Sequence, residues 1–281
     1  MCCLIYCAAA ILAFAIIARL IERHLRKPYV DRLTEKYVLI TGCDSGFGKL
    51  LVKQLDCKGV HVFAGCLTPK GAEEIDQETS ERVKTLVLDV TKHEHIEAAL
   101  EEIDQETSER VKTLVLDVTK HEHIEAALEE VERTLPSNTG LWGLVNNAGI
   151  SVACGLQEWH TREDYKRVLD VNILGLMDMC VTFLPLVRKA KGRIVNVASM
   201  EGRFALPSGA YAVSKFGVEA FSDSVRREAK MFHYGINVAI IEPGFFRTLI
   251  SSKNNFTNNL DKAWDRLTPE RKSEFIEEGF Q

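Results

Sequence analysis

Short apolar runs alternate with helix-like stretches from Lys36 onward, and this alternation restricts the fold more than any other feature of the sequence. Strands that are apolar at nearly every position are typical of parallel sheets that helices cover on both faces. We therefore predict a doubly wound α/β domain over residues 36–281. The apolar runs lie at residues 37–41, 60–64, 143–147, 193–197 and 236–241, and one further run, TLVLD, occurs twice.

The first run leads into a glycine-rich turn, residues 41–48 (TGCDSGFG), which is followed by an apolar-periodic helix. Glycines at a strand-to-helix turn let backbone N–H groups approach a pyrophosphate, and the positive end of the helix dipole favours the phosphate charge. A tightly packed turn without a ligand would show the same pattern. The turn by itself therefore leaves both interpretations open.

Four later motifs follow the glycine turn in order. They are NNAG at residues 146–149, Ser199 after RIVNVA, YAVSK at residues 211–215 and PGFFRT at residues 243–248. Together with the turn they resemble the short-chain dehydrogenase/reductase family. Flanking segments such as GLWGLVNNAG and GVEAFSDSVRRE resemble the microsomal retinol and hydroxysteroid dehydrogenase branch of that family. The resemblance covers most of residues 36–281.

The resemblance implies a catalytic set of Asn172, Ser199, Tyr211 and Lys215. Tyr211 would remove the proton of the substrate hydroxyl, Ser199 would bind the reacting oxygen, and Lys215 would hold the nicotinamide ribose. Asn172, in the helix DVNILG, would anchor a water relay from Lys215. The residues that the resemblance places at the cofactor are Gly42, Ser45, Gly46, Phe47, Gly48, Asp117, Asn147, Tyr211, Lys215, Pro243, Gly244 and Thr248.

The spacing of Tyr211 and Lys215 supports this chemistry without reference to any family. Residues four apart share one face of a helix, so both side chains can act on one bound molecule. A phenol titrates near 10, and a base that works at about pH 7 needs a pKa roughly three units lower, equivalent to about 4 kcal/mol. A close ammonium supplies part of that shift, so we expect Lys215 to lower the pKa of Tyr211. Taken singly, each residue of the set has an ordinary structural explanation.

Two features bear on the choice of dinucleotide. An acid at the end of the second strand usually binds the ribose hydroxyls of NAD, but residues 64–68 read AGCLT and contain none. Asp44 lies in the glycine turn, where phosphate-preferring members of the family often carry a base. Its negative charge would repel a 2′-phosphate, so we predict NAD as the cofactor.

A long segment of the chain is duplicated, because residues 73–100 recur letter for letter as residues 101–128. One tandem copy without substitutions differs from a solenoid, which needs about three or more units. A recent duplication or an error in assembling the sequence would explain it, and we favour the error. Asp89 and Asp117 are the two copies of an aspartate that lies beside adenine in the family. We favour Asp117, whose connection to NNAG is undisturbed, and expect the surplus unit to extend the sheet edge or loop out.

The N-terminus is strongly apolar. Residues 1–18 carry no charge, and four basic residues follow within residues 19–27. A helix of this length spans about 27 Å, close to the hydrocarbon thickness of a bilayer, so we predict a membrane anchor over residues 1–18 and a basic linker over residues 19–35. A cleavable signal peptide normally has its basic residues before the apolar run, whereas here they follow it, so cleavage is the less favoured interpretation. The basic flank predicts a cytosolic domain, and the resemblance implies the endoplasmic reticulum membrane.

The composition argues against several other classes of protein. The net charge of −5 arises from 35 basic and 40 acidic residues, which leaves no basic surplus for binding nucleic acid. Each copy of the repeat has more acidic than basic residues, so the imbalance reflects the duplication rather than a partner. The eight cysteines show no metal-ligand spacing, and we predict no metal site.

These observations lead to two hypotheses of function. The first is a membrane-anchored oxidoreductase that transfers hydride between NAD and the secondary or allylic alcohol of a lipophilic substrate, a retinoid or a hydroxysteroid. The resemblance implies a homodimer that pairs through the helices bearing Asn172 and Tyr211. Members of the family continue through a further strand and an apolar segment, so we expect the chain to be truncated at Gln281. The second hypothesis is therefore a catalytically inactive, truncated dinucleotide-binding or interaction protein.

Overall fold

The structure is a computed structural model that describes residues 30–86, 116–151, 156–207, 209–248 and 250–277. The chain separates into two compact units, Met1–Leu33 and Thr34–Gln281, and the second unit holds the α/β domain. The predicted membrane anchor at residues 1–18 lies outside the described residues.

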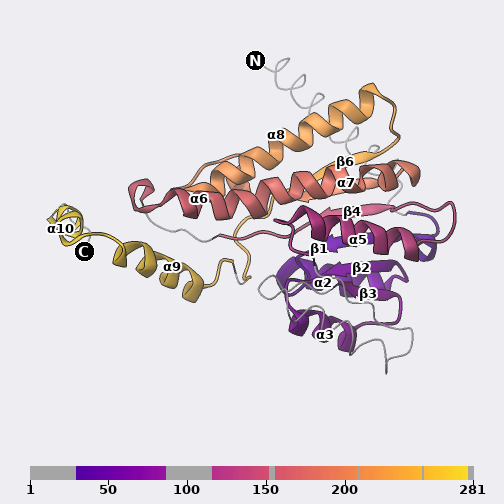
Figure 1. Cartoon of the computed structure of the whole chain (residues 1–281), viewed down its shortest axis with the longest axis horizontal. Helices are drawn as coiled ribbons and strands as arrows, with labels where there is room; N and C mark the ends of the chain where they lie inside the picture. The colour runs from indigo at the N-terminus through magenta and orange to yellow at the C-terminus, as the bar shows by residue number, and fades with distance from the viewer. Residues whose placement is uncertain (1–29, 87–115, 152–155, 208, 249, 278–281) are drawn as a thin grey trace, which may run out of the picture. The chain divides into compact units, whose positions relative to one another are not determined.

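Six parallel strands form one sheet in the order β3-β2-β1-β4-β5-β6 (Figure 1). In the central part of the sheet, Leu39 of β1 is in register with Phe63 of β2 and with Leu144 of β4. This order confirms the predicted parallel, Rossmann-like sheet. The strands are β1 (Tyr37–Thr41), β2 (His61–Gly65), β3 (Val83–Leu86), β4 (Gly143–Asn146), β5 (Arg193–Val197) and β6 (Asn237–Ile241).

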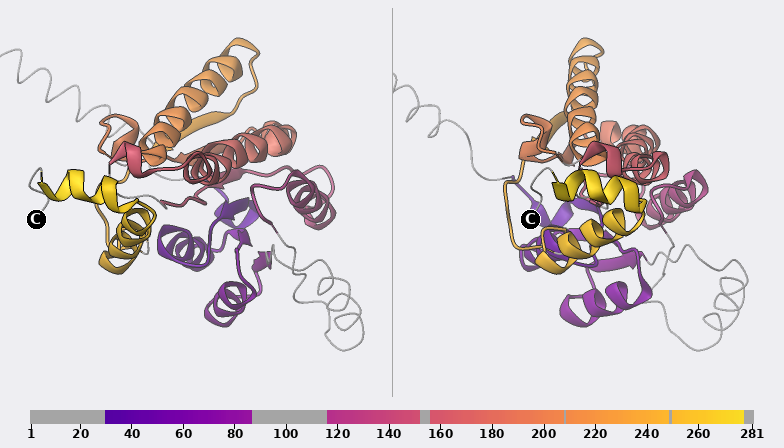
Figure 2. Two further views of the ribbon diagram at one scale, coloured as in Figure 1. Left: turned by 60° about the vertical axis from the view of Figure 1, so that its left-hand side comes forward. Right: turned by 90° about the vertical axis from the view of Figure 1, so that its left-hand side faces the viewer.

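Helices cover both faces of this sheet. One group, α5, α7 and α8, shares a hydrophobic core with the central strands, and α2 and α3 lie on the other side of the sheet from α5 (Figure 2). The α-helices are α2 (Gly46–Cys57), α3 (Pro69–Glu78), α5 (His121–Thr134), α6 (Arg162–Leu169), α7 (Leu176–Lys189), α8 (Ala210–Met231), α9 (Lys253–Asp265) and α10 (Pro269–Glu277). The short helical turns are η1 (Leu33–Glu35), η2 (Gln157–Trp159), η3 (Asp170–Gly175) and η4 (Met200–Gly202).

The core is filled by large apolar side chains from the sheet and from the helices above it. Leu39, Leu144 and Ile194 of the strands and Phe183 and Val218 of α7 and α8 are completely buried. Burying a side chain of this size contributes roughly 1.5–3 kcal/mol. The strands β1, β2 and β4 bury nearly every residue, as their apolar runs predict. In contrast, β5 leaves alternate residues partly exposed, and β6 buries only Val238.

The helices α6 and α7 join through η3 into one helical stretch, Arg162–Lys189. Among the described residues it is the one helix long and apolar enough to span a membrane, and 44% of its most apolar window is buried inside the domain. Met179 and Phe183 of α7 are fully buried in the core. Its apolar character is therefore explained by packing within the domain.

The two copies of the repeat contribute to different parts of the described fold. The first copy supplies the end of α3 and the edge strand β3, and the second copy supplies Leu116 and most of α5. Leu116 is buried, and its Cδ2 lies 3.2 Å from where a Cβ on Gly65 of β2 would stand. Residues from both copies thus complete one βα unit. Asp89 and the predicted surplus unit lie outside the described residues.

The helices α9 and α10 pack together at the C-terminal end of the described chain (Figure 2). Trp159 of η2 is buried against Ala263 of α9 and Phe275 of α10. The rings of Trp159 and Phe275 meet edge-on, with their centroids 5.3 Å apart. Arg266 also donates to Asp164 of α6 at 2.8 Å. The polar C-terminal stretch is therefore helical, and it is held to η2 by a small apolar cluster and to α6 by an ion pair.

Candidate active site

Glycine is needed for packing at two positions of the turn between β1 and α2. Gly42 has a φ of +69°, and a Cβ added there would lie 2.8 Å from the Cα of Ala148. A Cβ on Gly48 would lie 2.3 Å from the carbonyl oxygen of Gly42. Gly46 has a φ of +60°, but a Cβ there would meet Thr248 no closer than 3.8 Å. A Cβ at Gly46 would therefore only touch Thr248, and the positive φ is what favours glycine there.

Thr41 and Asn147 fasten the turn to the end of β4. The Thr41 hydroxyl accepts hydrogen bonds from the backbone N–H groups of Asn147 (3.1 Å) and Ala148 (3.0 Å). In return, the side-chain amide of Asn147 donates to the carbonyl oxygens of Thr41 (2.9 Å) and Gly42 (3.0 Å). Asn147 thus shapes the floor of the predicted cofactor site by holding the turn. Thr41 shares this role and is missing from the prediction, although a threonine that ends an apolar strand is a usable signal.

The N-terminus of α2 opens beside this floor. Its N-cap residue, Ser45, has an extended backbone (φ −160°, ψ 178°) and makes no side-chain capping bond. The N–H groups of a first helical turn have no intrahelical partners and carry the positive end of the dipole. Phe47 contacts Phe246 of the loop after β6, with ring centroids 5.3 Å apart. The turn can therefore present backbone donors to a pyrophosphate next to that loop.

Ser199 and Tyr211 meet beyond the end of β5. Ser199 is buried, caps η4 by accepting from the backbone N–H of Glu201 at 3.1 Å, and hydrogen-bonds the Tyr211 phenol. Burial raises the pKa of Tyr211, and the bond from Ser199 offsets part of this rise. The expected net lowering of this pKa is not observed. The physical reason is that burial of the phenol outweighs its hydrogen bond with Ser199. The Lys215 ammonium lies 5.5 Å from the centroid of the Tyr211 ring.

Lys215 lies one helical turn after Tyr211 on α8, as the spacing predicts. It is 4% exposed, and its Nζ donates to the carbonyl oxygen of Val197 at 2.8 Å. Burial lowers the pKa of Lys215 to about 8, so the amine can gain and lose a proton near neutral pH. A lysine in this state can hold a polar ligand group and also take part in proton transfer.

Asn172 reaches the same place from a π-helical turn. It lies in η3 (Asp170–Gly175), where the sequence predicts an ordinary helix. Its side chain accepts from the Ile150 N–H at 2.8 Å and donates to the Ile150 carbonyl oxygen at 2.9 Å. A Cβ on Gly149 would lie 3.5 Å from Asn172 Oδ1 and 3.6 Å from Lys215 Nζ. Both polar atoms therefore approach the glycine of NNAG. π-Turns such as η3 occur frequently at functional sites.

The loop after β6 borders the site from the other side. The carbonyl oxygen of Pro243 accepts from the Met200 N–H at 3.0 Å, which ties the loop to the turn that begins at Ser199. A Cβ added to Gly244 would lie 4.0 Å from the sulfur of Met200. Thr248 lies across from Gly46 and shares a hydrogen bond of 3.2 Å with the hydroxyl of Ser251. The predicted loop residues therefore lie next to the glycine turn and the Ser199 turn.

Two aspartates have roles that the sequence does not reveal. Asp44 accepts from the backbone N–H groups of Leu67 (2.6 Å) and Thr68 (2.9 Å) and from the Thr68 hydroxyl (2.8 Å). Its carboxylate therefore lies against the start of α3, directly after β2. Asp117 accepts from the N–H and hydroxyl of Thr119 at 2.9 and 2.8 Å, which orders the turn before α5. These bonds leave the predicted contact of Asp117 with adenine as a prediction.

Within the described ranges, no group of three or more His, Cys, Asp and Glu side chains is arranged to hold a metal ion.

Comparisons with known proteins give the site a context. The family model of the short chain dehydrogenases matches residues 36–115 and 94–259, and the two matches overlap inside the repeat. The chain belongs to this family. It is 46% identical to retinol dehydrogenase 7 of Rattus norvegicus, over 93% of this chain and 73% of that protein. It is 44% identical to retinol dehydrogenase 16 of Homo sapiens, over 92% of this chain and 72% of that protein. These relatives confirm the resemblance to the retinol dehydrogenase branch.

A solved structure gives the same fold. A 3-ketoacyl-(acyl-carrier-protein) reductase from Brucella melitensis, complexed with NADH, superimposes with a TM-score of 0.63 at 23% identity, covering 77% of this chain and 78% of that chain. The described residues fit a nicotinamide dinucleotide, because the first turn of α2 has no side-chain cap from Ser45 and buried Lys215 lies beside Gly149. With the retinol dehydrogenases among its relatives, the chain is an oxidoreductase of the short-chain family.

Proposed function

We propose that this protein is a membrane-anchored dehydrogenase that oxidises the alcohol of a lipophilic retinoid or hydroxysteroid with NAD. The observation that carries the proposal is the meeting of Ser199, Tyr211 and Lys215 next to the glycine turn. Ser199 hydrogen-bonds the phenol, and Lys215 follows it on the same helix face. Each of the three is at least largely buried, so the charges that develop during reaction are poorly screened by water.

The mechanism follows from these groups. Bound NAD supplies the acceptor for the hydride that leaves the carbinol carbon. Tyr211 takes the hydroxyl proton of the substrate, and Ser199 hydrogen-bonds the same oxygen. Lys215, when protonated, favours the phenolate form of Tyr211, and its pKa of about 8 lets it pass a proton onward. Asn172, whose Oδ1 approaches Gly149 as the Lys215 amine does, would hold a water in that path.

The proposed cofactor-binding residues surround the glycine turn. Gly42, Gly46 and Gly48 give access to the backbone N–H groups of Ser45 and Phe47, where the pyrophosphate would bind. Pro243, Gly244 and Thr248 would cover the nicotinamide, with Asn147 below it and Asp117 beside the adenine. The residues in this assignment are those that the sequence predicts.

The preference for NAD is supported by Asp44. Its carboxylate takes up the two backbone donors that follow β2, at Leu67 and Thr68. In this fold the adenosine ribose binds at the end of the second strand. A 2′-phosphate there would face a negative charge and donors that are already occupied, whereas a ribose hydroxyl carries no charge to repel.

The substrate class is supported by the relatives, which are named retinol dehydrogenases. An apolar N-terminal segment at residues 1–18 would tether the domain to the endoplasmic reticulum membrane, with the domain in the cytosol. Lipophilic alcohols partition into bilayers, so a tethered domain would have its substrate close by. Protease treatment of intact microsomes tests the orientation, because a cytosolic domain is digested and a lumenal one is protected.

A homodimer is supported by apolar side chains exposed on neighbouring helices. Leu174 and Val181 lie two turns apart on η3 and α7, and Val213 and Phe216 lie on α8. Exposed apolar residues gathered on packed helices are typical of protein interfaces. Light scattering of the detergent-solubilised protein tests this, since a monomer would contradict the proposal.

The central experiment measures oxidation of all-trans-retinol and of 3α- and 17β-hydroxysteroids by the full chain in detergent, with NAD or NADP. We expect turnover with NAD that Tyr211→Phe reduces by about 10²-fold or more. The matched control is Tyr234→Phe, because Tyr234 donates to Glu228 far along the chain from the site and should leave activity intact. NADH binding without turnover of any alcohol would instead support an inactive dinucleotide-binding protein.

A further inference from the structure

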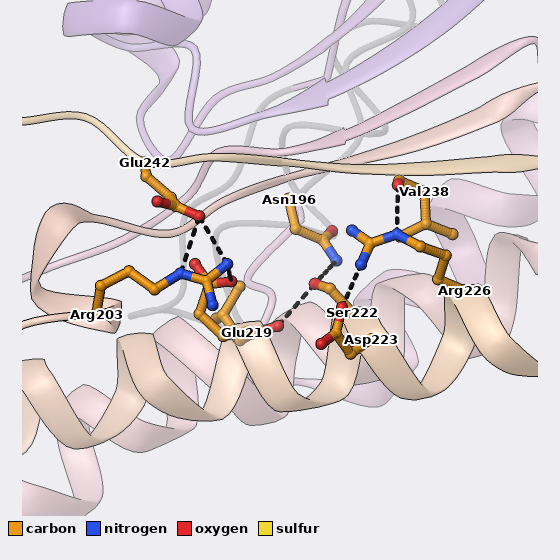
Figure 3. A network of polar contacts seen from close by, with 9 residues as sticks. Asn196, Arg203, Glu219, Ser222, Asp223, Arg226, Val238 and Glu242 are labelled. Atoms are coloured by element: carbon orange, nitrogen blue, oxygen red, sulfur yellow. Dashed lines mark hydrogen bonds and ion pairs between the residues drawn. The ribbon is translucent and has the colours of Figure 1, made fainter. Parts of the chain in front are cut away.

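The charged side chains of Arg203, Glu219 and Glu242 form a cluster on elements that also carry the candidate site (Figure 3). Arg203 follows η4, the turn that begins at Ser199. Its Nε and Nη2 both donate to Glu242 Oε1, at 3.1 and 2.9 Å, and its Nη2 lies 2.8 Å from Glu219 Oε2. One guanidinium therefore joins three elements: the Ser199 turn, the end of β6 and α8.

Each of these elements carries a part of the site. Glu242 immediately precedes the Pro243-Gly244 loop. Glu219 is one turn beyond Lys215 and two turns beyond Tyr211, so all three project from one face of α8. The cluster thus holds together the elements that carry the reacting residues and the loop proposed to cover the nicotinamide.

The packing around the cluster leaves little freedom. A Cβ on Gly202 would lie 3.0 Å from both Glu219 Cγ and the Lys215 carbonyl oxygen, so η4 rests directly on α8. The residues on either side of Ser199 are also bonded to the chain at the end of β6. The Ala198 N–H donates to the Ile241 carbonyl oxygen at 2.8 Å, and the Met200 N–H donates to that of Pro243 at 3.0 Å. The Ser199 turn is therefore clamped between α8 and the end of β6.

The charges of the cluster are unequal, with two carboxylates facing one guanidinium. Glu219 is buried, whereas the Arg203 side chain is 59% exposed. Burial and the charge of Glu242 raise the pKa of Glu219, while Arg203 acts in the opposite direction and Asp223 adds a smaller rise. Removing Arg203 would leave Glu219 and Glu242 to repel each other across the clamp.

We propose that Arg203, bound to Glu219 and Glu242, is a positioning residue that sets the Ser199 turn and the Pro243-Gly244 loop against Tyr211 and Lys215. The inference rests on the proposed function of this site. The Arg203 side chain is itself largely exposed, although Glu219 is buried, so loss of the arginine should lower stability by less than loss of a fully buried ion pair. Small displacements of reacting groups, in contrast, lower rates strongly.

Arg226 provides a matched control, because it joins α8 to β6, two of the elements that the Arg203 cluster joins, at a point farther along α8. Its Nε donates to the Val238 carbonyl oxygen of β6 at 3.1 Å, and its Nη1 pairs with Asp223 (Figure 3). It is similarly exposed and touches none of the site residues discussed above. Arg203→Ala and Arg226→Ala therefore remove comparable surface interactions, and one of them lies at the site.

The experiment compares wild type, Arg203→Ala, Arg203→Lys and Arg226→Ala as full chains in detergent. We expect Arg203→Ala to lower kcat by about tenfold, with a smaller change in the KM for the alcohol, and to weaken NADH binding about threefold in a fluorescence titration. Arg203→Lys should recover part of both losses, and Arg226→Ala should match wild type.

The NADH titration keeps the test independent of the substrate assignment. If wild type binds NADH but oxidises no alcohol, the proposed function fails, and the binding comparison still decides the role of Arg203. Equal kcat and equal NADH affinity in Arg203→Ala and Arg226→Ala would overturn the inference. The inference would also be overturned if both variants lost kcat and NADH affinity in proportion to a loss of thermal stability.

Discussion

Lys215 gives a quantitative test of how the candidate site is built, because its ammonium is charged and buried at once. Its folded-state pKa of about 8 lies below the ordinary lysine value of 10.5. The unfolded chain therefore binds more protons between these two pH values, and stability rises as the pH increases through this window. At pH 7 the shift corresponds to a destabilisation of about 3 kcal/mol, and by pH 9.5 about 2 kcal/mol of it should be relieved.

Lys215→Met removes this titration while keeping most of the side-chain volume. The free energy of unfolding of wild type should therefore rise by about 2 kcal/mol relative to Lys215→Met between pH 7 and pH 9.5. Lys215→Met also loses the hydrogen bond to Val197. This loss changes the free energy of unfolding of the variant by the same amount at both pH values, so it does not affect the predicted pH dependence.

The assay is urea unfolding of the full chain in detergent, followed by tryptophan fluorescence at both pH values. Lys230→Met is the matched control, since Lys230 lies exposed on the same helix and its ammonium stays in water. A difference between wild type and Lys215→Met that stays constant from pH 7 to pH 9.5 would refute the buried, depressed lysine. It would also remove the physical basis for proton transfer through that amine.

Three further predictions concern the glycine turn and the C-terminal helices. Asp44→Asn should raise kcat/KM with NADP relative to NAD by about tenfold in steady-state assays, because a negative charge is removed from the end of β2; an unchanged ratio contradicts this. Gly48→Ala, whose Cβ would lie 2.3 Å from the Gly42 oxygen, should cost about 2 kcal/mol or more in unfolding and weaken NADH binding. Trp159→Ala should cost about 3 kcal/mol and speed proteolysis between α9 and α10, and unchanged cleavage would argue against the cluster.

Much of the fold is predictable from the sequence because buried parallel strands carry a strong local signal. The runs that become β1, β2 and β4 are apolar throughout, and the structure buries nearly all of them. The positions of Tyr211 and Lys215 follow from helical spacing alone. That Ser199 meets Tyr211, and that Gly46 faces Thr248, depends on the order of strands in the sheet, which the family resemblance supplied.

Other features of the site depend on tertiary contacts that no local pattern contains. The π-turn at Asn172 looks like an ordinary helix in the sequence, and it forms where the side chain pairs with both backbone groups of Ile150. The pKa of Tyr211 is raised because burial outweighs the neighbouring donor, and the degree of burial is a property of the folded domain. The hydrogen bonds that Leu67 and Thr68 donate to Asp44 join residues more than twenty positions apart.

The regular spacing of Tyr211, Lys215 and Glu219 along α8 has a consequence for how this protein can change. Four residues advance a helix by about 6 Å and bring the side chain back to nearly the same direction. A gentle bend or shift of α8 would carry the three groups together and preserve their mutual arrangement. Inserting one residue between Lys215 and Glu219 would rotate everything beyond it by about 100° and separate the proton-transfer pair from its support. Substitutions along this helix should therefore be tolerated far more readily than any change in its length.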